Sequence, residues 1–201
     1  MASQTPLTDL EAVNMMLDAI GEAPVASLTT SNQTVDVSNA VRILGHVLNE
    51  TQSKGYNFNR EYNITLTFDS AGTINVPTNY TRVKVDPVYG DSSADIVHRG
   101  TKLFDRKNRT YVFTKNMIVS CIVLLAFDQI PESARRYVAI KATRKFSDTT
   151  MGDQATHQFT SQDEARAKIL LDNEEGENVG HTIFDSWSVA RTVNRYSRVL
   201  A

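Results

Sequence analysis

The sequence contains almost no cysteine, little proline and a single tryptophan, and its charges nearly cancel. Its one cysteine, Cys121, excludes an internal disulfide and any cysteine-rich zinc site. A formal net charge of −2 provides no overall attraction to nucleic acid or to an anionic membrane surface. No apolar run reaches the length of a membrane-spanning helix, and the first residues are polar rather than signal-like. These absences predict a globular protein of the cytosol.

The sequence motifs of common enzyme classes are also missing, among them the glycine-rich phosphate loops, Gly-x-Ser-x-Gly and His-Glu-x-x-His. Two acid pairs, Asp163/Glu164 and Glu174/Glu175, have the residue type that glycoside hydrolysis needs. Neighbouring residues of a helix do not face each other, so we interpret both pairs as solvated surface. We therefore predict no catalytic residue, no cofactor and no metal site. The four histidines, which lack metal-ligand spacing, are His46, His98, His157 and His181.

The longest apolar stretch runs from Ile118 to Phe127. It is rich in β-branched residues, which indicates a strand buried on both faces, with Cys121 as a small buried hydrophobe. Residues 128–131 end this strand, and Pro131 suits the first position of a helix that continues to Phe146. The helix should have one apolar face and a solvated basic flank. The apolar face comprises Ala134, Tyr137, Val138 and Ala142, and the flank comprises Arg135, Arg136, Arg144 and Lys145.

Two amphipathic helices are predicted near the N-terminus. Thr8 and Glu11 have the form of a capping box, in which each side chain accepts a hydrogen bond from the other residue's free amide. Apolar residues then recur at helical spacing as far as Ile20, where Gly21 supplies a left-handed C-terminal residue. A second amphipathic pattern predicts a helix from about residue 36 to residue 54.

A final helix is predicted from about Asp153 to Glu175. The pattern Ser161–Glu164 also fits a capping box, so the helix either begins near Asp153 or begins, or breaks, at Ser161. Acidic residues crowd its C-terminal end, where they oppose the helix macrodipole, and this indicates fraying or a basic partner. Its expected apolar side comprises Phe159, Ala165, Ile169 and Leu170.

The pattern between the second and third helices has the period of β-strands. Apolar and polar residues alternate in short segments separated by polar turns, which predicts antiparallel pairing. The fold class is therefore α+β: a bundle of about four helices, an antiparallel β-rich insertion between helices 2 and 3, and an extended C-terminal tail. The predicted strands are 62–68, 73–76, 80–85, 95–99, 102–104, 110–113 and 118–127. The predicted parts are 1–55 and 128–179 for the bundle, 56–127 for the insertion and 180–201 for the tail.

Two basic segments are candidate contact sites. The turn 105–109 would suit phosphate, although no aromatic residue is interleaved with its bases. The tail combines aromatic and basic residues with one acid, Asp185, and is too short to fold alone, so we expect it to cover another molecule rather than its own core. The turn residues are Arg106, Lys107 and Arg109. The tail residues are Ile183, Phe184, Trp187, Arg191, Arg195, Tyr196 and Arg198.

Several segments in the same order resemble the tail tubular protein A family, the adaptor or upper tail proteins of short-tailed phages (podoviruses). The most specific is Ala19-Ile20-Gly21-Glu22-Ala23-Pro24-Val25. The resemblance covers most of the chain from Leu7 to about Asn178, while the β-rich part diverges most and the last twenty residues compare only loosely. The similar segments are 12–25, 39–44, 52–59, 97–105, 127–132, 141–146 and 164–166.

This resemblance implies a structural virion protein that is assembled in the host cytoplasm and takes its place in the tail. Twelve copies would form a ring between the portal protein and the tail nozzle, which is tail tubular protein B, and would line the DNA ejection channel. Tail fibres commonly attach near the adaptor–nozzle boundary. On this reading the tail residues contact the portal, and the basic turn contacts the nozzle or passing DNA.

Two other functions remain open at the level of sequence. One is an adaptor that also hydrolyses host-surface polysaccharide through surface carboxylates. The other is a soluble nucleic-acid-binding protein that uses the basic turn and the tail. Release of reducing sugar that is abolished by substitution of an Asp or Glu would favour the first, and salt-sensitive DNA binding by the free monomer would favour the second.

Overall fold

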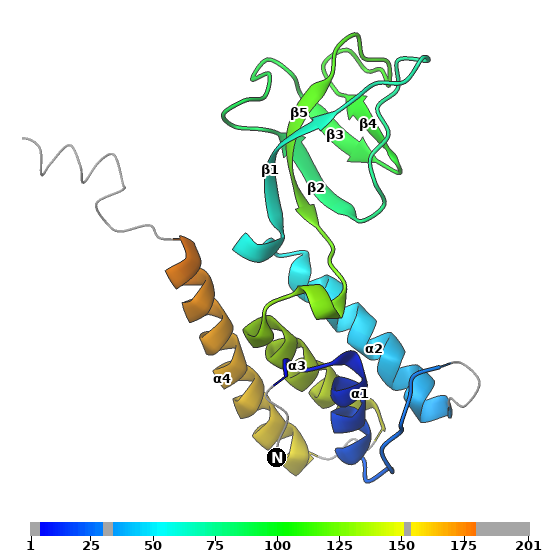
Figure 1. Cartoon of the computed structure of the whole chain (residues 1–201), viewed down its shortest axis with the longest axis vertical. Helices are drawn as coiled ribbons and strands as arrows, with labels where there is room; N and C mark the ends of the chain where they lie inside the picture. The colour runs from blue at the N-terminus through cyan, green and yellow to red at the C-terminus, as the bar shows by residue number, and fades with distance from the viewer. Residues whose placement is uncertain (1–4, 30–33, 151–153, 180–201) are drawn as a thin grey trace, which may run out of the picture.

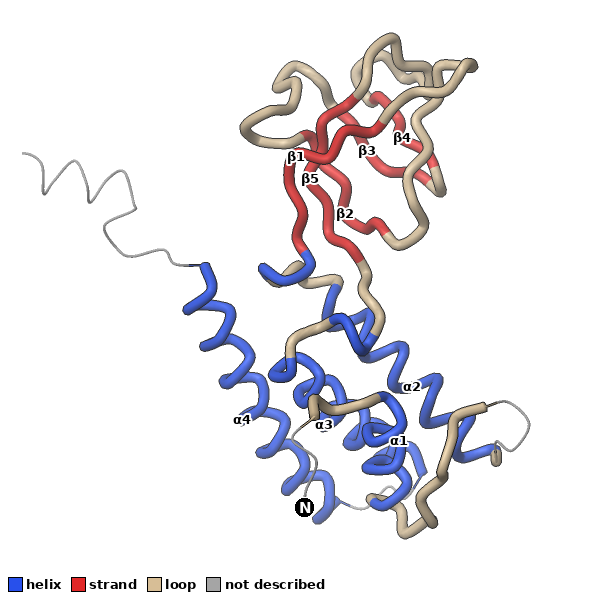
Figure 2. The backbone as a smooth tube through the Cα atoms, viewed as in Figure 1, coloured by secondary structure: helices blue, strands red, loops and turns tan. Residues whose placement is uncertain are grey.

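A computed structural model describes residues 5–29, 34–150 and 154–179, and shows two parts stacked end to end (Figure 1). The lower part is a helical bundle, and the upper part consists of short strands and loops (Figure 2). The β-rich part lies between helices 2 and 3, as predicted, and the fold is α+β. The bundle helices are α1 (Asp9–Asp18), α2 (Val35–Gln52), α3 (Glu132–Thr150) and α4 (Gln154–Val179). The strands are β1 (Arg60–Leu66), β2 (Tyr80–Val85), β3 (Ile96–Arg99), β4 (Lys102–Asp105) and β5 (Met117–Val123).

Helix α1 begins and ends as the sequence predicts. The Thr8 hydroxyl accepts from the Glu11 amide at 3.2 Å, and the Glu11 carboxylate accepts from the Thr8 amide at 2.9 Å, which completes the capping box. Gly21 has a φ of +79°, a conformation that residues with a Cβ rarely adopt. Val13 and Leu17 are buried against the rest of the bundle, so the local signal and the packing agree.

Helix α3 is the centre of the bundle. Its predicted apolar face (Ala134, Tyr137, Val138, Ala142) is buried, and α1, α2 and α4 all pack against the helix. The sequence predicts Pro131 at the first helical position, but it lies just before the first helical residue, Glu132. Its carbonyl accepts a hydrogen bond from the Arg135 amide, so Pro131 caps the helix. Each large side chain buried here contributes about 1.5–3 kcal/mol to stability.

The β-rich part contains two small antiparallel sheets. One has the order β1-β5-β2 and the other pairs β3 with β4. β5 is the central strand, with Val119 and Cys121 buried, which confirms the predicted buried strand and its thiol. The strand ends at Val123 rather than Phe127, because residues 124–126 leave the sheet to enter the bundle.

Three strand predictions need correction. Strict alternation in 62–68 is interrupted by a bulge at Asn63, whose φ is +55° and whose amide donates to Asp86 Oδ2 at 2.8 Å. The extra residue changes the register with β5, and Tyr62 is therefore exposed. The predicted strands 73–76 and 110–113 form only isolated bridges in the described structure.

The two parts are joined by a buried polar clamp between the two chain segments that cross the junction. The fully buried Gln52 side chain donates to the Leu125 carbonyl at 2.9 Å and accepts from the Leu125 amide at 2.8 Å. Asn59 is also buried, and its amide group donates to the carbonyls of Gln52 and Val123, each at 3.0 Å. The Leu125 side chain packs against the hydrophobic cores of both parts.

Arginines reinforce this junction from the β side. Arg82, in a bulge of β2 with a φ of +47°, donates to the Ser53 carbonyl at 2.9 Å and to the Lys54 carbonyl at 3.4 Å. Arg60 donates to the Gly55 carbonyl at 2.8 Å. These carbonyls lie at the C-terminal end of α2, where the helix macrodipole favours positive charge. The end of α2 is therefore held by both β1 and β2.

We expect Gln52→Leu to destabilise the protein by about 1–3 kcal/mol, because it leaves the buried amide and carbonyl of Leu125 without partners at little change in side-chain volume. Urea unfolding at pH 7 measures the loss. Gln162→Leu, on the exposed side of α4, is the matched control and should lie within about 0.5 kcal/mol of the parent chain. Equal unfolding midpoints for the two variants would contradict the clamp.

Candidate functional site

Helix α4 packs on α3 through a face that the sequence does not predict. Ala167 and Leu171 are buried, whereas Ile169 is 59% and Leu170 64% exposed. The prediction that Ala165, Ile169 and Leu170 form the buried side is therefore wrong. The Phe159 side chain lies outside the described residues.

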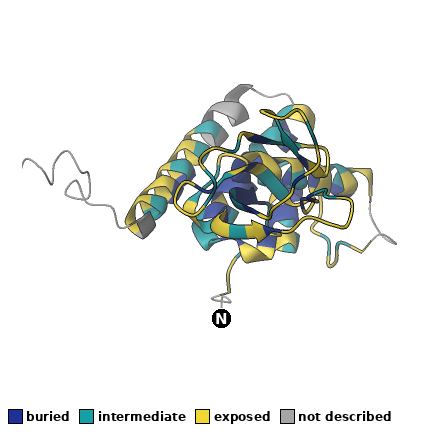
Figure 3. Cartoon of the chain, turned by 90° about the horizontal axis from the view of Figure 1, so that it is seen from above, coloured by how far each residue is buried: buried dark blue, intermediate teal, exposed yellow. Residues whose placement is uncertain are grey.

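Charged side chains explain why α4 has this orientation. Glu164 Oε2 accepts from Arg144 Nε of α3 at 2.5 Å. Lys168 lies over the rings of Tyr56 and Tyr137, at 5.5 and 5.9 Å from their centroids. Glu164 lies three residues before Ala167, and Lys168 lies one residue after it. These contacts therefore turn the side of α4 that contains Ala167 towards α3. Ile169 and Leu170 therefore belong to the exposed side of α4, and Figure 3 shows that this helix has many exposed residues.

The outward rotation leaves an apolar groove of about 740 Å³ between α3 and α4. Apolar atoms contribute most of the surface that lines the groove, although several lining residues are polar or charged. Within the described part of the chain, nothing fills it. Leu170 forms one wall, and Met15 of α1 closes one side. Exposed apolar surface of this kind marks binding sites in proteins. The groove is lined by Met15, Glu132, Ser133, Arg136, Ile140, Thr143, Asp163, Arg166, Ala167, Leu170 and Glu174.

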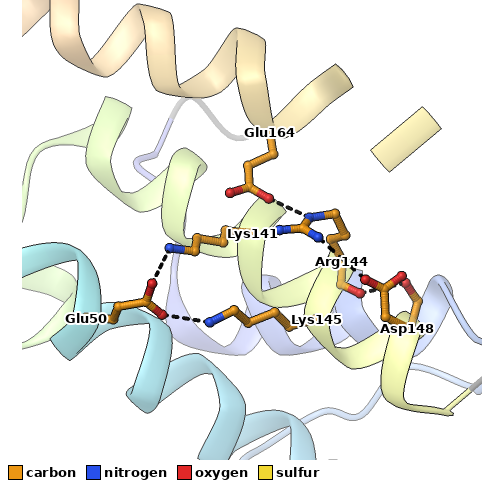
Figure 4. Close-up of polar contacts among 7 residues, drawn as sticks. Glu50, Lys141, Arg144, Lys145, Asp148 and Glu164 are labelled. Atoms are coloured by element: carbon orange, nitrogen blue, oxygen red, sulfur yellow. Dashed lines mark hydrogen bonds and ion pairs between the residues drawn. The ribbon is translucent and has the colours of Figure 1, made fainter. Parts of the chain in front are cut away.

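Ion pairs hold α2 and α4 on either side of α3 (Figure 4). Glu50 of α2 accepts from Lys141 Nζ at 2.8 Å and from Lys145 Nζ at 2.6 Å. The Lys141 side chain is only 8% exposed, and sequence reasoning missed it. Its spacing of three residues from Val138 places it on the buried face and is the signal that could have revealed it.

The predicted solvated flank of α3 is therefore only partly correct. Arg144 pairs with Glu164 and, at 3.5 Å, with Asp148. Arg135 is half-buried and donates to the carbonyls of Ile130, at 2.8 Å, and of Leu7, at 3.1 Å. Arg136 alone remains mostly exposed. Arg135, Arg144 and Lys145 therefore tie neighbouring segments to α3, whereas Arg136 pairs with Glu132 of α3 itself.

The basic turn contributes less free charge than its sequence indicates. Arg106 forms two hydrogen bonds with Asp95 Oδ1, at 2.6 and 3.0 Å. Asp105 accepts from the backbone amides of Lys107 and Asn108, which shapes the turn. Lys107 and Arg109 lie exposed, and they are the turn residues that remain available to a partner.

Three of the four carboxylates considered for catalysis, Asp163, Glu164 and Glu175, are engaged in structure. Asp163 lies 3.5 Å from Arg166 Nη1, and Glu164 is bonded to Arg144. Glu175 accepts from the amide of Asn57, which ties the acidic end of α4 to the start of the β-rich part. Among residues 5–29, 34–150 and 154–179, no three His, Cys, Asp or Glu side chains gather to hold a metal ion.

Two further features limit the chemistry of the chain. Burial raises the pKa of the Cys121 thiol to about 11, so it stays protonated at neutral pH. No described helix combines the length and apolar character needed to cross a bilayer.

The predicted tail contacts (Ile183, Phe184, Trp187, Arg191, Arg195, Tyr196 and Arg198) lie outside the described residues.

The ion pairs of Glu50 should make stability depend on pH. Hydrogen bonds from Lys141 and then Lys145 lower the pKa of Glu50 from 4.5 to about 2. Because the pKa is lower in the folded state, this stabilisation is complete above about pH 4.5 and is lost as pH falls towards 2. The Glu50 side chain is half exposed, so screening limits its contribution to about 1 kcal/mol.

We therefore expect Glu50→Gln to be less stable than the parent chain at pH 7, and the difference to shrink at pH 3. Urea unfolding at both pH values measures it. Glu177→Gln, which removes an exposed carboxylate of α4, should leave the pH dependence unchanged. A Glu50→Gln variant that keeps the full acid sensitivity of the parent would show that these pairs contribute nothing.

Comparisons with known proteins identify the family of the chain. Residues 10–181 match the tail tubular protein family. Tail tubular protein A of Klebsiella phage KP34 is 27% identical over 166 residues, which cover 82% of this chain and 85% of that protein. The family match includes every described helix and strand apart from the first residue of α1. The chain therefore belongs to the tail tubular protein family, a family of structural components of phage tails.

Proposed function

We propose that the chain is a ring-forming adaptor that connects the portal to the tail nozzle. Its helical end and residues 180–201 dock on the portal, and its β-rich part docks on the nozzle. Twelve copies enclose the channel through which DNA leaves the capsid. The observation that carries this proposal is the apolar groove beside α4, with Ile169 and Leu170 exposed next to it.

The groove supports assembly over catalysis. A protein that works alone gains stability by burying large apolar side chains, and α4 instead leaves two of them in water beside an apolar hollow. Two of the three acids that line the groove are already paired: Glu132 accepts from the Leu7 amide and pairs with Arg136, and Asp163 pairs with Arg166. Such a surface fits another protein better than a sugar chain, which requires hydrogen-bonding groups.

The far end of the β-rich part offers a second surface. Val88 and Tyr89 are exposed in one loop, and Tyr111 and Val112 are exposed in another. These loops belong to the part of the chain furthest from the bundle (Figure 1). A molecule with exposed apolar residues at both ends fits a connector between two partners, and Lys107 and Arg109 add positive charge for the nozzle or for DNA.

The charge balance fits a conduit for DNA. A protein that holds DNA neutralises phosphates with many lysines and arginines, and each such contact strengthens binding. Here 21 basic residues are offset by 23 acidic ones, and Arg106 is already paired with Asp95. A ring of such chains would let phosphates pass rather than retain them.

We expect Trp187→Ala to weaken portal binding about 30-fold or more, because truncating a buried aromatic anchor costs about 2 kcal/mol or more. Arg195→Ala is the comparison and should cost at most about 1 kcal/mol, as an ion pair at an exposed rim. Co-sedimentation with purified portal measures binding, and thermal melting checks that each variant is folded. A Trp187→Ala chain that binds as well as the parent would overturn the proposed portal contact.

Deletion of residues 180–201 should abolish portal binding and leave the melting temperature of the remaining chain nearly unchanged. The reason is that the tail is expected to cover a partner rather than its own core. The same two measurements apply. If the deletion unfolds the chain, the tail belongs to the core and its assignment to the portal fails.

A further inference from the structure

Helices α2 and α4 occupy opposite sides of the bundle. Both pack on α3, and Figure 2 shows α4 on one flank and α2 on the other. Each helix therefore has one face against α3 and another that points away from the molecule. The two outward faces differ in shape and charge, and this difference bears on how copies of the chain meet.

The α4 side is concave, apolar and acidic. It contains the groove, with Leu170 and Ile169 exposed along it. Glu174 lines the groove and Glu177 follows one turn later, and neither has an ion-pair partner among the described residues. Residues 161–177 contain six acidic and two basic residues. This side therefore offers an apolar hollow with surplus negative charge.

The outward side of α2 is partly apolar and has a small surplus of unpaired positive charge. Val41 is 36% exposed, and Gly45, one turn later, has open space where a side chain would be. Small residues on a helix allow the surface of another helix to approach closely. Arg42 of α2 and Lys54, two residues beyond its end, are exposed, and neither has an ion-pair partner in the described part of the chain. Asp36 at the start of α2 has none either, so the unpaired charges of residues 35–54 are two positive and one negative. Glu50, by contrast, is already paired with two lysines.

We propose that the groove of one copy receives the outward face of α2 from the next copy. Val41 would enter the hollow beside Leu170, and Arg42 and Lys54 would face the surplus acids of α4. This inference rests on the proposed ring and names the surfaces that build it. Because the two surfaces are different and lie on opposite flanks, each contact leaves one of each free, so copies add head to tail rather than pairing as a two-fold dimer. A head-to-tail contact of this kind is the type that a ring requires, and the proposed twelve-fold ring fixes the rotation between copies.

A second copy fits the groove better than the chain's own tail or a portal segment. The face of α2 carries the opposite surplus charge to α4 and is itself uncovered in the described structure. Every copy in a ring must also bury two lateral surfaces, and the two flanks of the bundle provide them. Occupation by residues 180–201 is the main competing possibility, and it is tested directly below.

Cross-linking of introduced cysteines tests the proposal. The double variant Val41→Cys/Leu170→Cys is mixed with purified portal and treated with a short bis-maleimide. The native Cys121 is buried in β5, so it does not take part. We expect a ladder of dimer, trimer and higher species on a denaturing gel. An equimolar mixture of the two single variants should give dimers and no ladder, because each copy then carries only one reactive side.

Four results would overturn the proposal. Dimers from either single variant alone would show that like faces meet. A ring detected by mass without a ladder would place the lateral contact elsewhere and leave the adaptor function standing, whereas the absence of any ring on the portal would remove both. Slow maleimide labelling of free Leu170→Cys, compared with the exposed reference Gln162→Cys, would show that the chain's own tail fills the groove.

Discussion

The clamp between Gln52 and the Leu125 backbone is the constraint on which the rest of the structure depends. Among the residues that the structure describes, two chain segments cross between the bundle and the β-rich part, and these hydrogen bonds join them where each crosses. The Asn59 side chain extends this network by donating hydrogen bonds to the carbonyls of Gln52 and Val123. Unpaired polar groups are costly in such a site, so the junction is held in one geometry. A connector needs this, because its two ends must keep a fixed separation and direction.

Helix α3 plays the corresponding role within the bundle. Its apolar face supplies the core, while its bases reach sideways to acids on α2 and α4. Packing and charge thus have separate effects. Burial of apolar side chains stabilises the bundle, and the ion pairs determine which faces of α2 and α4 turn towards α3. The consequence for α4 is functional, because the chosen face leaves Ile169 and Leu170 outside. A purely apolar contact would have buried them and removed the groove.

Local signals in the sequence predict local structure, and long-range contacts account for what they miss. The capping box of Thr8 needs only three residues, and it forms as expected. The exposure of Tyr62 depends on a bulge at Asn63, which is set by an aspartate 23 residues away. The outward position of Ile169 depends on partners in other elements. Gln52 looks like one more polar residue at a helix end, and its partner lies 73 residues along the chain.

The central claim is that this tail tubular protein assembles into a ring on the portal. Native mass measurement of the purified chain, alone and mixed with purified portal, tests it most directly. We expect the free chain to be largely monomeric at micromolar concentration, because the exposed apolar surface of the described structure is confined to a few small areas. With the portal, we expect a complex of one portal and twelve copies of the chain. A stable ring of the free chain would contradict assembly on the portal. A mixture in which the two components keep their separate masses would contradict the adaptor function itself.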